Sequence, residues 1–368
     1  MKIGFDAKRL FHNQTGLGNY SRDLVRILKE FYPKDTYVLF NPKAKTIPFY
    51  SDSSLFRTVT PQGWWKKLHP IWRTYGIAKE NSIQELDIYH GLSGEIPANL
   101  PATIKKVVSI HDLIFERYPN LYSNWDRRMH RKKFQYAVDH ADAIVAISEQ
   151  TKRDIVQFLQ VPETKIHVIY QGCSAIFKQS FTDELLHNTR TKFGLPQTFV
   201  LNVGTLEERK NAFSLVKAIK DLDTALVLIG RETDYCKAIH QYIEKHQLHK
   251  KVLFLKNVSQ LELAHIYTLA TVFAYPSVFE GFGIPIIEAM FCNTPVITTN
   301  SGVFPEAGGP DSIYVDPYDI QDISTQINRL INDAALRNAI ATKGRDYVER
   351  FQDTTIAVQW HNLYKNIL

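Results

Sequence analysis

Short runs of β-branched and aliphatic residues alternate along the chain with longer stretches in which apolar residues recur every three or four positions. The short runs predict strands, and the first half contains six: Lys2–Asp6, Tyr37–Asn41, Leu86–His90, Lys106–Ile110, Ala143–Ile147 and Ile166–Tyr170. The second half contains five: Phe199–Gly204, Ala225–Gly230, Val252–Leu255, Val272–Tyr275 and Val296–Thr299. Helical spacing is clearest at Tyr20, Leu24, Ile27, Leu28 and Phe31. Such alternation predicts parallel sheets covered by helices on both faces.

The alternation breaks once, between Gly172 and Phe199, where a polar stretch contains only the short helical segment Asp183–Phe193. A chain of 368 residues is long enough for two domains of ordinary size. We therefore expect an α/β fold of two doubly wound, Rossmann-like domains that face a cleft. The predicted first domain comprises residues 1–176 with a returning C-terminal helix in 352–368, and the predicted second domain comprises residues 177–351.

Several sequence features bear on the compartment in which the protein works. No run of about 18 apolar residues exists, and the N-terminus, MKIGFDAKRL, lacks the apolar core of a secretion signal. Cys173, Cys236 and Cys292 are far apart and have no ligand-like spacing to histidines. These features predict a cytoplasmic protein with neither a disulfide nor a bound metal.

Positive charge is concentrated in the first half, where residues 1–176 contain 25 Lys and Arg against 17 Asp and Glu. This excess suits an anionic partner. The stretch Trp64–Arg73 interleaves tryptophans with basic residues, and Arg127–Lys133 forms a second basic cluster. Both could rest on an anionic membrane surface, although buried tryptophans and a solvated helix face explain them equally well. Nucleic acid is not expected as a partner, because no recognised motif accompanies the charge.

The strongest local motif is Val278–Glu288, which follows a predicted strand. Gly281 and Gly283 let the backbone approach a ligand, and a proline at the start of the next helix leaves free amides that attract anions. Glu280 and Glu288 add two carboxylates that can accept hydrogen bonds from sugar or ribose hydroxyls. The simpler interpretation is a glycine turn followed by a solvated helical glutamate.

A second basic loop, Thr205–Asn211, follows the strand Phe199–Gly204. Its Arg209 and Lys210 would stand at the carboxyl end of that strand, where an arginine can bind a diphosphate through two hydrogen bonds. Adjacent basic residues in a loop are also common on solvated surfaces. The neighbouring Glu207 and Glu208 could equally pair with them.

Two further segments in the first half lie at predicted strand ends. His111 and Asp112 follow the strand Lys106–Ile110, where an imidazole could exchange a hydrogen bond with a reacting hydroxyl or phosphate. The segment Thr15–Tyr20 lies where a dinucleotide fold places its glycine fingerprint. Its third glycine is replaced by serine, which disfavours a nicotinamide enzyme.

These motifs together resemble the retaining family-4 glycosyltransferases of GT-B fold, most of all the bacterial mannosyltransferases of polysaccharide and O-antigen assembly. The motifs that carry the resemblance are TGLGNY, HDLIFERYP, AISEQTKRDI, VIYQG, VGTLEERKN and EGFGIPIIEA. They occur in the family's order over nearly the whole chain. One departure is Thr205, which stands where many relatives carry an arginine.

The resemblance implies a role for each matching residue. Glu288 would hold the ribose, Glu280 the donor sugar, and the amides of Phe282, Gly283 and Ile284 the sugar or diphosphate. Arg209 and Lys210 would neutralise the leaving diphosphate, and His111 would face the donor sugar. Gly16 or Gly18 would lie close to the phosphate or the acceptor.

The resemblance also implies the reaction, which needs no metal ion and no cofactor. A hexose such as mannose would move, with retention, from a GDP- or UDP-linked sugar to a glycan or polyprenyl-linked acceptor during surface polysaccharide or lipopolysaccharide synthesis, at the inner face of the membrane. Two alternatives remain at this stage. One is another sugar enzyme of similar architecture, a nucleotide-sugar epimerase or a glycosidase. The other is a two-lobed sugar-binding protein without catalysis.

Overall fold

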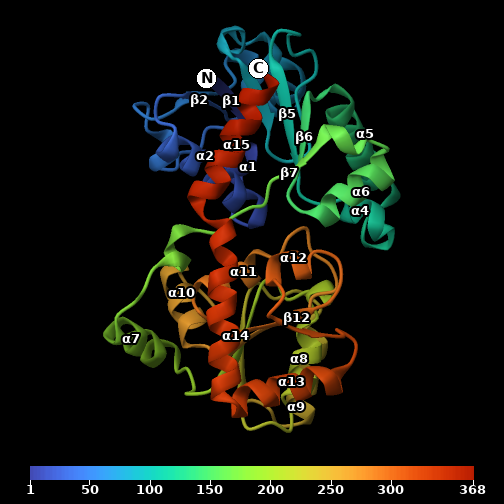
Figure 1. Ribbon diagram of the computed structural model, residues 1–368. Coiled ribbons are helices and arrows are strands. Elements are labelled where there is room, and N and C mark those ends of the chain that lie inside the picture. Colours follow the sequence, from blue (N-terminus) through green and yellow to red (C-terminus); the bar gives the residue numbers. More distant parts are fainter. The chain divides into compact units, whose positions relative to one another are not determined.

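The computed structural model describes residues 1–368, and the chain divides into two compact units. Unit 1 comprises Met1–Gly172 and Phe351–Leu368, and unit 2 comprises Cys173–Arg350. The corresponding sequence-based limits were residues 1–176 with 352–368, and 177–351. Each unit has its own parallel sheet, so each can be understood as a separate Rossmann-like domain (Figure 1).

The sheet of unit 1 has seven strands, all paired in parallel, in the order β3-β2-β1-β4-β5-β6-β7. The strands are β1 (Lys2–Asp6), β2 (Thr36–Phe40), β3 (Arg57–Val59), β4 (Ile88–Gly91), β5 (Lys105–Ile110), β6 (Ala143–Ala146) and β7 (Ile166–Val168). The α-helices are α1 (Lys8–His12), α2 (Gly16–Phe31), α3 (His69–Ile71), α4 (Ile114–Arg117), α5 (Asn124–His140), α6 (Glu149–Leu159) and α15 (Asp353–Ile367).

The sheet of unit 2 has six parallel strands in the order β10-β9-β8-β11-β12-β13. The strands are β8 (Phe199–Val203), β9 (Ala225–Ile229), β10 (Val252–Leu255), β11 (Val272–Tyr275), β12 (Val296–Thr299) and β13 (Ile313–Val315). The helices are α7 (Asp183–Phe193), α8 (Ala212–Ala218), α9 (Cys236–Lys245), α10 (Gln260–Leu269), α11 (Ile284–Phe291), α12 (Phe304–Gly308), α13 (Ile320–Asn332) and α14 (Ala334–Tyr347).

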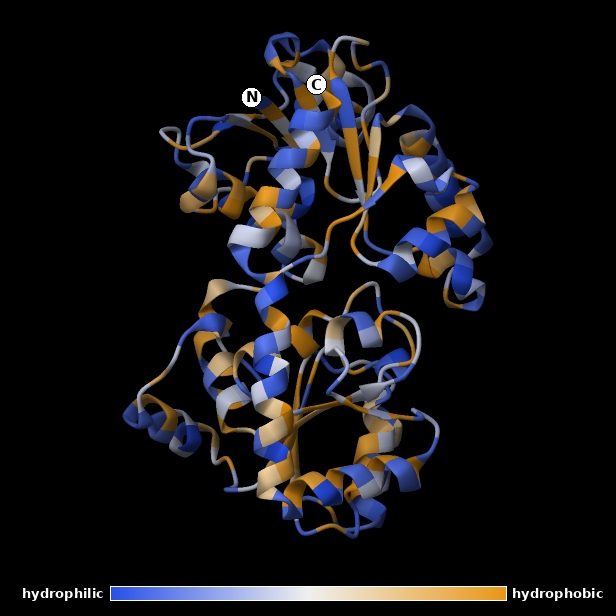
Figure 2. Cartoon of the chain, in the orientation of Figure 1, coloured by the Kyte–Doolittle hydropathy of each residue, from blue (hydrophilic) through white to orange (hydrophobic).

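All eleven strands expected from the sequence are present, with ends that differ by two residues at most. Their interior residues form the cores of the two units, and Figure 2 shows hydrophobic strands beneath helices that carry hydrophilic residues. The sequence analysis missed β3 and β13, which have three residues each and lie at sheet edges. Edge strands bury fewer side chains, so their hydrophobic signal is weak.

The C-terminal helix α15 packs on unit 1 beside α2 (Figure 1). Arg26 of α2 forms an ion pair of 2.8 Å with Asp353 at the start of α15. Further along α15, the ring of Trp360 lies 4.7 Å from that of His90, and the hydroxyl of Tyr364 is 2.8 Å from His90 Nδ1. These contacts attach the last helix to the end of β4.

His90 is a structural residue in this fold. Both ring nitrogens are occupied, since Nε2 lies 2.8 Å from the Ser109 hydroxyl and Nδ1 faces Tyr364. Burial and the nearby His111 lower the pKa of His90 to about 3. The imidazole is therefore neutral near pH 7, with one nitrogen donating and the other accepting.

The stretch Trp64–Arg73 does not form one continuous surface, which corrects part of the expectation of a membrane contact. Trp72 is fully buried and its indole N–H donates to Glu80 at 2.7 Å. Arg73 is also buried, and its guanidinium forms ion pairs with Asp6 and Glu95. The exposed residues of the stretch, among them Trp64, Lys66 and Lys67, come before Trp72 in the sequence. No helix of the chain is both long enough and apolar enough to cross a bilayer.

Candidate active site

In both sheets the strand order reverses between two neighbouring strands, β1 and β4 in unit 1 and β8 and β11 in unit 2. Loops that leave such neighbours run in opposite directions along the sheet, and the space between them at the carboxyl ends is where open α/β sheets bind ligands. In unit 2 the two loops are those that carry Arg209, Lys210 and Glu280. The sheet topology thus brings together residues about 70 positions apart in the sequence.

Glu280 lies between the two cations. Its Oε2 is 2.9 Å from Arg209 Nη1 and its Oε1 is 3.0 Å from Lys210 Nζ. The Tyr275 hydroxyl donates to Oε1 at 2.7 Å and receives a hydrogen bond from Lys210 at 2.8 Å. The Ser277 hydroxyl oxygen lies 3.2 Å from Oε1. Both oxygens of this glutamate are therefore engaged.

The electrostatics of this cluster keep Glu280 and Arg209 charged. Burial alone would raise the pKa of Glu280, but the charges of Lys210 and Arg209 overcome it and lower that pKa to about 2. Burial would likewise lower the pKa of Arg209, but Glu280 and Glu207 raise it above its ordinary value. The expected pairing of Arg209 with Glu207 is present at 2.6 Å.

Backbone contacts hold the two loops in register. The carbonyl of Arg209 accepts hydrogen bonds from the amide of Val278 at 2.9 Å and from the hydroxyl of Ser277 at 3.1 Å. Asn211 adopts the left-handed conformation, which asparagine tolerates, and its amide donates to the Pro276 carbonyl at 3.2 Å. These hydrogen bonds connect the loop that carries Arg209 and Lys210 to the loop that carries Glu280.

The glycine motif leads into the N-terminus of α11. Gly283 has φ +112°, a conformation that side chains disfavour, and a Cβ there would approach Ile286 at 3.2 Å. Phe282 is buried, and Ile284 opens the helix. Pro285 has no N–H and the Ile286 amide donates to the Gly283 carbonyl at 2.9 Å, so Ile284 supplies the amide that this helix end can offer to an anion.

Glu288 lies about one turn into α11, where the Tyr267 hydroxyl donates to its Oε2 at 3.0 Å. Burial and the neighbouring Glu288 raise the pKa of Tyr267, so this hydroxyl keeps its proton. Thr205 follows Gly204, which has φ +142°; a Cβ at Gly204 would approach the Lys210 side chain to 3.1 Å, so the missing side chain leaves room for that lysine. The structure thus gathers Arg209, Lys210 and Glu280 into one cluster.

In unit 1, His111 stands at the end of β5. Its Nε2 donates to the Leu92 carbonyl at 3.0 Å, which leaves Nδ1 as the acceptor of a neutral ring. Burial and the charge of Arg9 lower the pKa of His111 to about 4. The ring of Tyr20 packs edge-on against it at 4.4 Å. Near pH 7 this histidine can accept a hydrogen bond through Nδ1 and carries no charge.

The two glycines at the start of α2 differ in their surroundings. A Cβ at Gly18 would lie 1.8 Å from the Asn13 carbonyl oxygen, whereas a Cβ at Gly16 would meet nothing within 4 Å. Gly18 is therefore required by the packing of the preceding loop. Gly16 is the one that leaves room for a ligand.

We predict that Gly18→Ala destabilises the protein by about 1–3 kcal/mol, because the added methyl group must displace backbone. Gly16→Ala should leave the melting temperature nearly unchanged, and thermal unfolding of both variants measures the difference. If Gly16→Ala proved the more damaging to stability, this account of the loop would be wrong. Reduced turnover in a fully stable Gly16→Ala variant would identify Gly16 as a position that the substrate approaches.

Comparison with known protein families agrees with this arrangement. Residues 16–175 match the family described as "Glycosyltransferase Family 4", and residues 187–347 match "Glycosyl transferases group 1". The chain is a family-4 glycosyltransferase of GT-B fold. The fold and the enzyme class predicted from the sequence are confirmed, and the epimerase, glycosidase and binding-protein alternatives are set aside.

Two similar curated proteins align with this chain over nearly its whole length. The chain is 26% identical to O-antigen chain mannosyltransferase B of Escherichia coli, over 99% of this chain and 100% of that protein. It is 27% identical to O-antigen chain mannosyltransferase RfbU of Salmonella typhimurium, over 94% of each.

Two solved structures share the glycosyltransferase's fold over its full length. Anabaena HepE in complex with UDP has a TM-score of 0.78 at 20% identity and covers 100% of both chains. Sucrose-phosphate synthase of Thermosynechococcus elongatus has a TM-score of 0.78 at 21% identity, covering 100% of this chain and 99% of that one.

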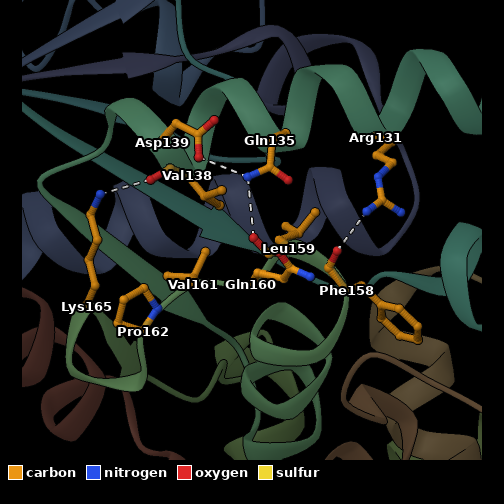
Figure 3. Close-up of a pocket in the computed structure, with 10 residues that line it drawn as sticks. All are labelled: Arg131, Gln135, Val138, Asp139, Phe158, Leu159, Gln160, Val161, Pro162 and Lys165. Carbon is orange, nitrogen blue, oxygen red and sulfur yellow. Dashed lines mark hydrogen bonds between the residues drawn. The ribbon is translucent and has the colours of Figure 1, made fainter.

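A pocket of about 460 Å³ lies between α5 and the end of α6 of the glycosyltransferase and contains none of the predicted site residues (Figure 3). Its polar side chains already bind backbone carbonyls: Arg131 donates to Phe158, Gln135 to Leu159 and Lys165 to Val138. These carbonyls belong to the last turns of α6 and α5, where helices lack internal partners. The polar groups of this pocket hold two helices together.

Sequence reasoning missed two tyrosines of the active site. Tyr275 connects Lys210 with Glu280, and Tyr267 holds Glu288. Both hydroxyls are attached to buried aromatic rings, which in a sequence are indistinguishable from core residues. The one available signal was the position of Tyr275 at the end of its strand, directly before the glutamate loop.

Proposed function

We propose that this glycosyltransferase moves a hexose, with mannose as the first candidate, from a GDP- or UDP-linked sugar to a glycan or polyprenyl-linked acceptor in surface polysaccharide synthesis. Transfer would proceed with retention and without a metal ion or cofactor. Support comes from the two O-antigen mannosyltransferases that the chain resembles from end to end. The crystal structure of Anabaena HepE, which has the same fold, is of a complex with UDP.

The observation that carries this proposal is the charged cluster at the reversal point of the unit 2 sheet. Lys210 uses two of its three N–H donors on Tyr275 and Glu280, which leaves one for a phosphate oxygen. Arg209 lies beside it with its guanidinium held by Glu280 and Glu207. Two pre-positioned cations and the amide at the start of α11 would stabilise the charge that develops on a departing diphosphate.

The remaining residues take roles that follow from their partners. Glu280 positions both cations through its two oxygens. It would also accept one hydrogen bond from a hydroxyl of the donor sugar. Glu288, whose Oε2 accepts a hydrogen bond from Tyr267, would accept hydrogen bonds from the vicinal hydroxyls of a ribose. His111, neutral and accepting through Nδ1, would receive a hydrogen bond from a hydroxyl of the donor sugar. Unit 1 would bind the acceptor and unit 2 the donor.

The decisive experiment measures nucleotide released from GDP-mannose and from UDP-hexoses, with EDTA present, with and without a lipid-linked oligosaccharide acceptor. We expect release only when the acceptor is present, and NMR of the product should show the anomeric configuration of the donor. Equal release without acceptor would indicate a hydrolase. An inverted product, or loss of activity in EDTA, would contradict the proposed chemistry.

We predict that the two glutamates separate nucleotide binding from sugar binding. Glu288→Gln should weaken both the free nucleoside diphosphate and the sugar nucleotide by about tenfold, the value of a hydrogen bond to a charged group. Glu280→Gln should not weaken the free nucleoside diphosphate, because removing the carboxylate charge leaves Arg209 and Lys210 more positive. The sugar nucleotide alone should lose affinity, as calorimetric titration would measure. Equal losses of nucleoside diphosphate affinity would contradict the assignment.

We also predict a salt-sensitive contact between unit 1 and anionic membranes, restricted to the accessible part of the Trp64–Arg73 stretch. Trp64 is 63% exposed, and both Lys66 and Lys67 are exposed. Each basic residue near anionic lipid contributes about 1 kcal/mol, and salt screens that attraction. Sedimentation with anionic liposomes should carry the protein down at low salt and release it at high salt. Unchanged sedimentation of Lys66→Glu with Lys67→Glu would rule this surface out.

A further inference from the structure

A chain of three buried hydrogen bonds connects the C-terminal helix α15 with α2 inside unit 1. The Tyr364 hydroxyl lies 2.8 Å from His90 Nδ1, and His90 Nε2 lies 2.8 Å from the Ser109 hydroxyl. The Ser109 hydroxyl in turn lies 2.9 Å from that of Tyr20. All four side chains are buried. An unpaired polar group is costly in such surroundings, so each hydroxyl depends on its partner in the chain.

His90 makes the two ends of this chain depend on each other. Burial keeps its imidazole neutral near pH 7, and a neutral imidazole donates through one nitrogen and accepts through the other. The bonds of His90 to Tyr364 and to Ser109 therefore run in the same direction. Loss of the Tyr364 hydroxyl would leave Nδ1 unpaired and would no longer fix the tautomer that His90 presents to Ser109.

The other end of the chain reaches His111. Ser109 and His111 are two positions apart at the end of β5, so their side chains project from the same face of the sheet. Tyr20 contacts both residues. Its hydroxyl bonds Ser109, and its ring stands perpendicular to the His111 ring with the two centroids 4.4 Å apart. The position of the Tyr20 ring against His111 is therefore set by the bond to Ser109.

His111 needs this second support. The hydrogen bond from its Nε2 to the Leu92 carbonyl fixes the tautomer and one point of the ring, but the ring could still tilt about that point. Arg9 of α1 and His90 of β4 lie close enough to act on its charge. The perpendicular ring of Tyr20 opposes the tilt, and edge-to-face contacts of this kind are favourable.

We infer that Tyr20 is a positioning residue for His111, and that the chain through Ser109 and His90 to Tyr364 holds Tyr20 in place. The inference rests on the proposed function, in which His111 accepts a hydrogen bond from the donor sugar through Nδ1. It adds that α15, which contains none of the candidate active-site residues, contributes to the orientation of His111.

Tyr20→Phe is the first test, because it keeps the ring and removes only the hydrogen bond to Ser109. We expect kcat to fall about tenfold, since a small displacement of a group that contacts the reacting sugar is enough to lose alignment. KM for the donor should change by less than about twofold, because the diphosphate and ribose would bind to unit 2. Unchanged kcat in the folded variant would overturn the inference.

Tyr37→Phe is the matched control. Tyr37 is as deeply buried in unit 1, and its hydroxyl donates to the carbonyls of Leu28 and Tyr32 at the far end of α2. This variant also loses a buried hydrogen bond, so its melting temperature should fall, but its kcat should not. An equal loss of kcat in Tyr37→Phe would show that Tyr20 has only a structural role.

Tyr364→Phe tests the chain from its other end. We expect a smaller loss of kcat than in Tyr20→Phe, and the double variant should lose no more than Tyr20→Phe alone, because both hydroxyls act through the same bonds. Losses that multiply in the double variant would contradict the connection through His90 and Ser109.

Tyr20→Leu tests the contact with His111 without any turnover. Burial, together with the charge of Arg9, lowers the pKa of His111 to about 4. Removing the Tyr20 ring admits water, so this pKa should rise toward its ordinary value of 6.5. NMR of the histidine rings, assigned with His111→Gln, should show His111 titrating above about pH 5 in Tyr20→Leu but not in the wild type or in Tyr37→Phe.

The titration also predicts a change in the pH profile of turnover. His111 accepts a hydrogen bond only when neutral, so activity is lost as the pH falls through its pKa, and in Tyr20→Leu this loss should begin at a higher pH than in the wild type. An unchanged titration of His111 would overturn the role of Tyr20. If no acceptor releases nucleotide, the proposed function fails, while the titration still decides whether Tyr20 holds His111.

Discussion

Replacing both Arg209 and Lys210 with alanine is expected to lower turnover by about two orders of magnitude or more, comparable with the loss of a preorganised charge-stabilising group in other enzymes. The two side chains lie at the carboxyl end of β8, held by Glu280, Tyr275 and Glu207. They would act most strongly when the glycosyl–phosphate bond breaks and negative charge grows on the diphosphate. Steady-state kinetics with saturating acceptor measures the effect, which should fall mainly on kcat.

The double variant has a structural consequence that needs its own control. Without the two cations, the buried Glu280 would be an unpaired charge, and such losses commonly cost about 3–5 kcal/mol of stability. Adding Glu280→Gln removes that charge, so the triple variant should regain melting temperature without regaining turnover. Near-normal turnover in a folded double variant would remove Arg209 and Lys210 from the mechanism.

Trp360→Ala is expected to destabilise unit 1 by about 3–5 kcal/mol, the usual cost of truncating a buried aromatic residue. Trp360 is fully buried between α15 and the sheet, where it packs on His90 and Tyr364. Truncation leaves a cavity at the point where α15 is attached. Urea unfolding of the full chain, followed by tryptophan fluorescence and circular dichroism, should show a lower midpoint for the transition of unit 1.

Val358 provides the matched control for this prediction, because it lies on the same helix and is 47% exposed. Val358→Ala should change stability by no more than about 0.5 kcal/mol, as is usual for surface positions. If Trp360→Ala proved as mild as Val358→Ala, α15 would not contribute to the stability of unit 1. The contacts of Trp360 with His90 and Tyr364 would then have no stabilising role.

The periodic pattern was sufficient to predict the fold class. Strands such as Val252–Leu255 and the helix Asp183–Phe193 have the same limits in the sequence and in the structure, because a buried strand or an amphipathic helix leaves its period in consecutive residues. The edge strand Arg57–Val59 left no such trace, since two of its three residues are exposed. Local pattern therefore predicts an element to the extent that the element buries one of its faces.

The tryptophans of the Trp64–Arg73 stretch show the limit of composition. Trp64 and Trp72 look alike in the sequence, yet one is exposed and the other fully buried with its N–H on Glu80. Burial of a single side chain depends on what the rest of the fold places around it. A count of aromatic and basic residues cannot contain that information.

By itself the sequence determined the two α/β domains, the family, the positions of Glu280, Arg209, Lys210 and His111 after strand ends, and that of Glu288 in the helix that follows. Only the tertiary structure decided how these residues act on one another. The reversal of strand order between β8 and β11 places Arg209 and Lys210 against Glu280, which sets its pKa to about 2 and engages both of its oxygens. A hydrogen bond from His111 to Leu92 decides its tautomer. Charge state and hydrogen-bond direction depend on distances of about 3 Å between residues far apart in the chain, and those distances exist only after the sheets have formed.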